Sequence, residues 1–350
     1  MSTPLITASS IEVVSDLIAS ASNYNVVGKV FEAAGLPERC TTNPGCFVPM
    51  KSVVKLYDEA ARVIGERNLG LFLAPHLTVS KLGNLGSYVL GATTLKEAMF
   101  RNSKAMKLRT SHGRISTAPC GDDVAFMSDL SVSNVVGYRH TAVWSALLLI
   151  SVVRAYTGAN WHPLRVDLDI SRPPSSTPYE DVFRCPVIFD RPRIAVIIER
   201  HALNNGPVLA AGRKTVTYSD LRRIAERPAP TDLVSIVREI IRLRLLDGDI
   251  DIDGIARHLE LGPRTLQRRL NDAGTAFRAL VSQVRAERAL EMLRETEAPM
   301  IDIAIELGYS SSSHFTRAFR KAVGRLPSDI RRDALAGDCN ARGFPAAARS

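Results

Sequence analysis

Cysteine is scarce in this chain of 350 residues, and the five cysteines match no zinc-binding or disulfide pattern. Their number is odd and they include no C-x-x-C pair, so we expect reduced thiols. Long apolar runs are also missing, since the longest, residues 144–153, falls well short of the roughly 20 residues needed to cross a bilayer. Residues 1–23 contain no basic segment followed by an apolar core. We therefore expect a cytoplasmic protein with no membrane partner and no secretory signal.

Motifs for catalysis, metal binding and nucleotide binding are missing as well. The seven histidines show no H-E-x-x-H spacing, and no G-x-S-x-G occurs. The glycines of residues 82–86 lack the ending of a phosphate loop, so tight packing is their expected role. Residues 249–260 fit the pattern of a calcium loop, but the same segment is needed for a helix whose expected N-cap is Asp253. We expect no enzyme, no catalytic residue, no cofactor and no metal site.

Charge and length favour a two-domain protein with a polyanionic partner. The formal net charge is +9, which favours nucleic acid without proving it. Lysine and arginine are spread over the whole chain, so the placement of individual arginines is more informative than their number. The length is sufficient for two domains that each have a hydrophobic core.

The first two thirds of the chain mix helix and strand patterns. Apolar residues recur at helical spacing up to about residue 110, and residues 140–156 are expected to form a buried apolar helix. Because these elements do not alternate strictly, we predict an α+β domain over residues 1–220. A basic segment with prolines, residues 221–231, is the expected linker. Strand patterns occur at residues 114–130, 164–170, 187–189 and 194–198.

A recognition helix is expected at residues 263–272. Gly262 can serve as its N-cap and Pro263 suits its first position. Leu266 and Leu270 lie one turn apart on one face, while arginine, glutamine and asparagine share another. Arginine pairs with guanine, and glutamine or asparagine with adenine, in the major groove, although the segment alone also fits a solvated surface helix. The residues expected to bind DNA here are Arg264, Thr265, Gln267, Arg268 and Asn271.

A second helix-turn-helix follows the first. Residues 253–259 are the helix before the first recognition helix, and a second recognition helix is expected at about residues 311–323. The joining helix, residues 276–296, is roughly 30 Å long, close to the spacing of about 34 Å between major-groove segments on one face of DNA. The two helices are thus expected to enter adjacent major grooves. The residues expected to bind DNA in the second are Ser312, Ser313, Thr316, Arg317 and Arg320.

Three segments resemble the DNA-binding domain of AraC/XylS transcription regulators: residues 261–270, 303–309 and 314–329. The resemblance implies an all-α domain with two helix-turn-helix motifs over residues 232–333, followed by a disordered tail at 334–350. Gly262 stands where the family usually has a serine cap. By position, the resemblance implies base contacts from Arg264, Gln267, Arg268, Ser312, Ser313, Thr316 and Arg317.

Residues 10–210 resemble the N-terminal "arabinose-binding" type effector domain of one branch of this family, on segments 82–86, 94–98 and 178–189. This resemblance implies an effector-responsive regulator that binds double-stranded promoter DNA as a homodimer. It leaves the small-molecule effector open among amino acids, fatty acids and other compounds, and makes RNA polymerase a further candidate partner. Two alternatives remain: a DNA-binding scaffold without a ligand, and an enzyme with a nucleophilic cysteine fused to a DNA-binding domain.

Overall fold

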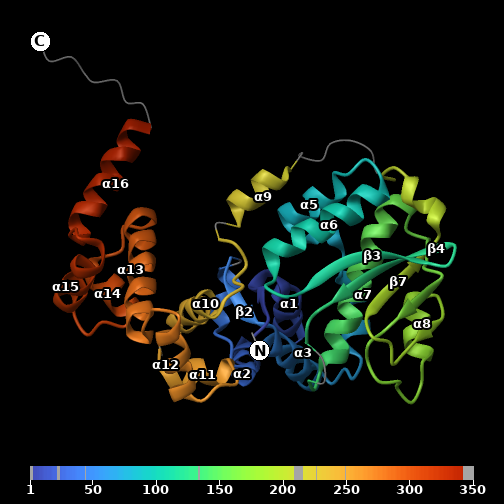
Figure 1. Ribbon diagram of the computed structural model, residues 1–350, viewed down its shortest axis with the longest axis horizontal. Coiled ribbons are helices and arrows are strands. Elements are labelled where there is room, and N and C mark those ends of the chain that lie inside the picture. Colours follow the sequence, from blue (N-terminus) through green and yellow to red (C-terminus); the bar gives the residue numbers. More distant parts are fainter. Residues whose placement is uncertain are drawn as a thin grey trace, which may run out of the picture. The chain divides into compact units, whose positions relative to one another are not determined.

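The computed structural model describes two compact units (Figure 1), Met1–Thr231 and Asp232–Ser350. Unit 1 combines helices with β-sheet and unit 2 is helical, which confirms the predicted α+β domain followed by an all-α domain. The residues described are 3–21, 24–43, 45–132, 135–208, 216–225, 227–248 and 250–341.

A mainly antiparallel sheet with strand order β3-β4-β7-β5-β6 lies in unit 1. Only the pair β5–β6 is parallel. Strands β3 and β4 form a hairpin that reverses at Gly121, whose φ of +62° suits glycine. The strands are β3 (Arg114–Cys120), β4 (Asp123–Asp129), β5 (Arg165–Asp167), β6 (Val187–Ile188) and β7 (Ile194–Ile198).

The central element of unit 1 is α7 (Tyr138–Thr157), the predicted apolar helix. It packs on β4 and β7 of the sheet and on helices α3, α4 and α6. Two of its polar side chains form hydrogen bonds inside the core: Ser145 Oγ donates to Ser128 Oγ at 2.8 Å, and Tyr156 Oη donates to the carbonyl of Ala92 at 3.0 Å. In the described part of the chain no helix combines the length and the apolar composition needed to span a membrane.

The other helices of unit 1 mostly precede the sheet in the chain. Gly86 confirms the tight packing expected of residues 82–86, because a Cβ there would lie 2.0 Å from the carbonyl oxygen of Val79. The helices are α1 (Glu12–Ala21), α2 (Tyr24–Ala34), α3 (Met50–Ile64), α4 (Leu69–Phe72), α5 (Gly83–Leu90), α6 (Leu95–Arg109) and α8 (Thr177–Phe183). Short 3-10 helices span Ala8–Ser10, Glu38–Thr42, Ala74–His76, Val79–Lys81 and Arg200–Asn204.

The sequence patterns did not predict two short strands of unit 1. β1 (Leu5–Thr7) pairs antiparallel with β2 (Phe47–Pro49), and together they form a second sheet. Each strand has three residues and is almost wholly buried, so neither shows the alternation of apolar and polar residues that marks a strand in sequence.

The expected linker and tail both overlap helices. α9 (Tyr218–Ile224) covers the start of the expected linker at 221–231, because Thr217 and Asp220 form a capping box and Leu221 is buried. α16 (Pro327–Ala341) continues into the expected tail at 334–350 and packs on α13 of unit 2. Residues 342–350 lie outside the described residues.

Unit 2 consists of helices in the order that two helix-turn-helix motifs require. They are α10 (Leu233–Leu245), α11 (Ile252–His258), α12 (Pro263–Asp272), α13 (Phe277–Glu295), α14 (Met300–Glu306), α15 (Ser312–Val323) and α16. An ion-pair network fastens α10 to α13: Arg238 Nη1 lies 2.7 Å from Glu287 Oε1, and Arg242 bridges Glu287 and Glu239.

Candidate nucleic-acid interface

The first recognition helix, α12, has the predicted bounds and phase. Gly262 is its N-cap with extended backbone angles, and Pro263 occupies the first helical position. Leu266 and Leu270 are each 0% exposed, whereas Arg264, Gln267, Arg268 and Asn271 are exposed. Thr265 differs from them because it is half-buried. The helix therefore presents two guanidinium groups and two amides on one solvent-facing surface.

The preceding helix, α11, begins at Ile252, one residue before the predicted start, and its N-cap lies two residues before the predicted cap. Its N-cap is Asp251, whose carboxylate accepts a hydrogen bond from the backbone N–H of Gly254 at 2.6 Å. The prediction that Asp253 is the cap is wrong, because Asp253 lies within the first turn of the helix. The tight turn to α12 passes through Glu260, which has a φ of +55°.

The second recognition helix, α15, starts at Ser312 because Ser311 caps it, accepting from the backbone N–H of His314 at 3.2 Å. Phe315 and Phe319 are buried, and their ring centroids lie 5.7 Å apart. Of the predicted DNA-binding residues, three are exposed: Ser313, Arg317 and Arg320. The other two are half-buried: Ser312 and Thr316.

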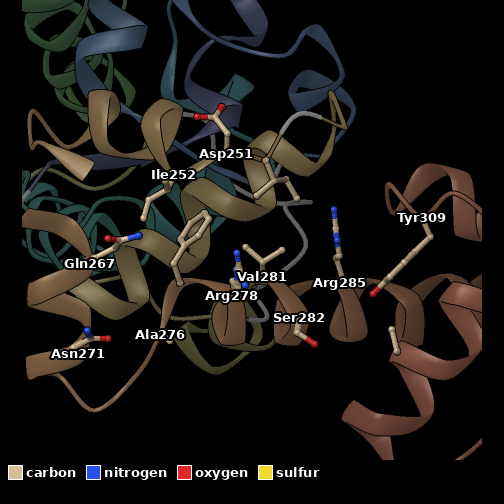
Figure 2. A pocket seen from close by; sticks show the side chains of 13 residues that line it. Asp251, Ile252, Gln267, Asn271, Ala276, Arg278, Val281, Ser282, Arg285 and Tyr309 are labelled. Carbon is tan, nitrogen blue, oxygen red and sulfur yellow. The ribbon is translucent and has the colours of Figure 1, made fainter. Parts of the chain in front are cut away.

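A groove of about 770 Å³ lies between the two helix-turn-helix motifs. Figure 2 shows Gln267 and Asn271 at one end, Tyr309 at the other, and residues of α13 along the helix between them. The residues of α13 are Arg278, Ser282 and Arg285. None of these three was predicted to bind DNA, although their spacing of four and three residues places them on one helix face.

Arg285 connects α13 to the second motif. Its guanidinium carbon lies 5.1 Å from the ring centroid of Tyr309, within the range of a cation–π contact. Gly308, with a φ of +73°, forms the turn beside it, and a Cβ at this glycine would come within 3.0 Å of Arg285 Nη2. Burial raises the pKa of the Tyr309 hydroxyl above its ordinary value.

Comparisons with known proteins agree with this arrangement. Residues 27–206 match the arabinose-binding domain of AraC transcription regulators (N-terminal), and residues 255–333 match a helix-turn-helix domain. The chain is 28% identical to the ornithine utilization regulator of Pseudomonas aeruginosa over 339 residues, covering 91% of this chain and 94% of that protein. It is 27% identical to an uncharacterized HTH-type transcriptional regulator of Mycobacterium tuberculosis, covering 78% and 80%. The activator RhaS of Escherichia coli is 34% identical over 84 residues, 24% of this chain and 30% of that protein.

Proposed function

Because this chain belongs to the AraC family of transcription regulators and is a DNA-binding regulator with an effector-binding N-terminal domain, we propose that α12 and α15 read bases in two adjacent major grooves. The observation that carries the proposal is the exposed polar face of each helix opposite a buried apolar anchor. The proposed DNA-binding residues are Arg264, Thr265, Gln267, Arg268, Asn271, Ser312, Ser313, Thr316, Arg317 and Arg320.

The side chains divide into two groups by reach. The exposed arginines of α12 and α15 extend far enough to pair with guanine, and Gln267 and Asn271 offer the paired donor and acceptor that adenine requires. The half-buried residues Thr265, Ser312 and Thr316 have short side chains, which suits contacts with a phosphate oxygen or a thymine methyl group.

The groove between the motifs adds a second kind of contact. The DNA backbone that separates two adjacent major grooves would face α13, and we assign phosphate contacts there to Arg278 and Ser282, both of which are exposed. Arginine and serine bind phosphate oxygens without reading sequence, so this contact would fix the register of the two recognition helices.

Substitution of Arg268 by alanine tests direct readout. We expect Arg268→Ala to lose about 1–3 kcal/mol of affinity for an operator selected from random DNA, and to relax the preference at one base pair. Arg294→Ala is the matched control, because Arg294 is an exposed arginine outside the proposed contacts. In a mobility-shift titration, equal losses for the two variants with unchanged base preference would contradict the assignment.

We further propose that residues 1–220 sense an effector and form a homodimer. In this proposal residues 232–333 bind DNA, and the protein acts in the cytoplasm. RNA polymerase is a candidate partner there. The full-length similarity to a regulator named for ornithine utilization makes an amino acid one candidate effector, alongside fatty acids. Size-exclusion chromatography with light scattering of the full chain tests the dimer; a monomer at micromolar concentration would contradict it.

Three of the four described cysteines, Cys40, Cys46 and Cys185, lie in surroundings that do not favour a nucleophilic thiolate. Cys40 and Cys46 are buried, and burial raises the pKa of Cys185 to about 11. A thiol with such a pKa stays protonated near neutral pH, and it is the thiolate that acts as a nucleophile.

A further inference from the structure

Unit 1 contains a cavity of about 340 Å³, a volume at the lower end of the range for small-molecule sites. Its wall is formed by β1, β2, the turn before α5, the end of α6 and helix α9. Most of the large side chains that line it are apolar: Phe47, Leu82, Leu85, Leu108, Leu221 and Ile224.

A buried arginine also lines this cavity. Arg109 is the last residue of α6 and only 9% of its surface is exposed. Its hydrogen bonds go to hydroxyl groups: Nε donates to Thr7 Oγ1 at 3.3 Å, and Nη2 donates to Ser9 Oγ at 3.4 Å and to Ser10 Oγ at 2.8 Å. Within the described residues, Nη1 donates no hydrogen bond and no carboxylate lies within ion-pair distance of the guanidinium.

This arrangement leaves a buried positive charge that forms no ion pair within the described residues. Burial lowers the pKa of Arg109 to about 10, because the charged form loses contact with water there. Three neutral hydroxyl groups cannot neutralise the charge, and a buried ion without a partner is costly for a folded protein. Glu12 also lines the cavity, and its negative charge favours the charged form of Arg109 from beyond ion-pair distance. Glu12 and Lys81 are both exposed, so water weakens the influence of their charges.

We propose that this cavity binds a small organic carboxylate, whose charged group pairs with Arg109 while its apolar body lies against Leu82, Leu85 and α9. A carboxylate supplies the missing negative charge, and the planar guanidinium can hold it with two parallel hydrogen bonds. The inference rests on the proposed effector-sensing role of unit 1 and names the chemical class of the effector.

Helix α9 connects the wall of this cavity to the segment that leads into unit 2. It contributes Leu221 and Ile224 to the wall, and Ile224 is half exposed. Its own anchors are few: Tyr218 packs beside Tyr88 with ring centroids 6.0 Å apart, and Lys104 Nζ lies 4.1 Å from the Tyr218 ring centroid. Only residues 225–232 separate α9 from α10, the first helix of unit 2. An occupant of the cavity would therefore contact the segment that leads into the DNA-binding unit.

Isothermal titration calorimetry of the full chain without DNA tests the proposal. The probes are octanoate, octan-1-ol and octylamine, which share a chain length and differ in charge, together with L-leucine as an amino acid. We expect octanoate or L-leucine to bind at least about tenfold more tightly than the alcohol and the amine. Binding of octanoate would indicate a fatty acid as the class of ligand, and binding of L-leucine would indicate an amino acid. Failure of both carboxylates to bind, or equal binding by octanoate and octan-1-ol, would overturn the proposal.

Substitutions then locate the bound carboxylate. Arg109→Met should weaken its binding about 10- to 100-fold, whereas Arg101→Met, on the same helix and already paired with Glu97 at 2.8 Å, should not change it. Ile224→Trp should fill the cavity from the opposite wall and block binding with Arg109 intact. Unchanged carboxylate binding by Arg109→Met would overturn the assignment. If Arg109→Met does not fold, unchanged carboxylate binding by Ile224→Trp would overturn it. The affinity of the unliganded wild-type protein for operator DNA is measured separately. Failure of the carboxylate proposal would therefore be distinguishable from failure of the proposed DNA contacts.

Discussion

Substitution of Leu266 by alanine should unfold the first helix-turn-helix at a much lower denaturant concentration. Leu266 is 0% exposed, and in α12 it shares the buried positions only with Leu270. The change removes three buried carbon atoms, a loss of about 2–3 kcal/mol in transfer free energy, and the cavity raises the cost to about 2–5 kcal/mol. That is a large part of the roughly 5–15 kcal/mol that holds a typical domain together.

The two tryptophans allow the two units to be followed separately in the full chain. Trp144 and Trp161 both belong to unit 1, so tryptophan fluorescence reports that unit, while circular dichroism reports the helices of both. Leu266→Ala should lower the urea midpoint of the transition seen only by circular dichroism by about 1–2 M and leave the fluorescence transition unchanged. The control is Arg269→Ala, at an exposed position of the same helix. Equal midpoints for the two variants would refute the burial argument.

Three further predictions concern acid stability, a helix cap and salt. Burial lowers the pKa of His140 to about 4 from 6.5, so the unfolded chain binds a proton that the folded chain does not, and the free energy of unfolding should fall as pH drops from 6.5 to 4. His140→Asn should flatten this dependence in urea titrations followed by fluorescence, and an unchanged slope would contradict the assignment. Thr94→Ala removes the acceptor for the Glu97 N–H at 3.2 Å and should cost about 1 kcal/mol by urea unfolding, while Thr94→Ser should restore most of it. A fragment of residues 227–341 should bind a half-site with a shallower salt dependence than the full-length chain, because the proposed dimer would neutralise more phosphates, and equal slopes would argue against dimerisation.

The helix-turn-helix pair could be predicted because its signals are local. Gly262 and Pro263 mark the start of α12, and the spacing of Leu266 and Leu270 sets its buried face. The N-cap of α11 was misplaced because aspartates alternate along this stretch, and only the hydrogen bond to Gly254 selects Asp251. The start of the predicted linker is part of helix α9. Its basic residues and the prolines that follow are typical of a linker, but Thr217 and Asp220 cap a helix.

Features that depend on distant segments could not be predicted. Arg109 ends a basic helix, a position typical of a solvated side chain, and nothing local shows that the hydroxyls of residues 7–10 enclose it. Arg278 and Ser282 show helical spacing, but their relation to α12 depends on how the motifs are placed around α13. The pairing of β1 with β2 likewise joins segments some 40 residues apart.

The single helix α13 has a consequence for the kind of DNA sequence this protein can use. Its 19 residues join the two motifs without interruption, and Arg285 braces its junction with the second motif. One extra base pair between the two contacted segments would move the second by about 3.4 Å and rotate it by about 35° around the DNA axis, and a rigid helix cannot follow. Within one protomer, sites along a genome should therefore tolerate base changes but not insertions. In the proposed homodimer, variable gaps are expected only between the half-sites of the two protomers, so a search for target promoters should use an ungapped half-site paired at variable distance.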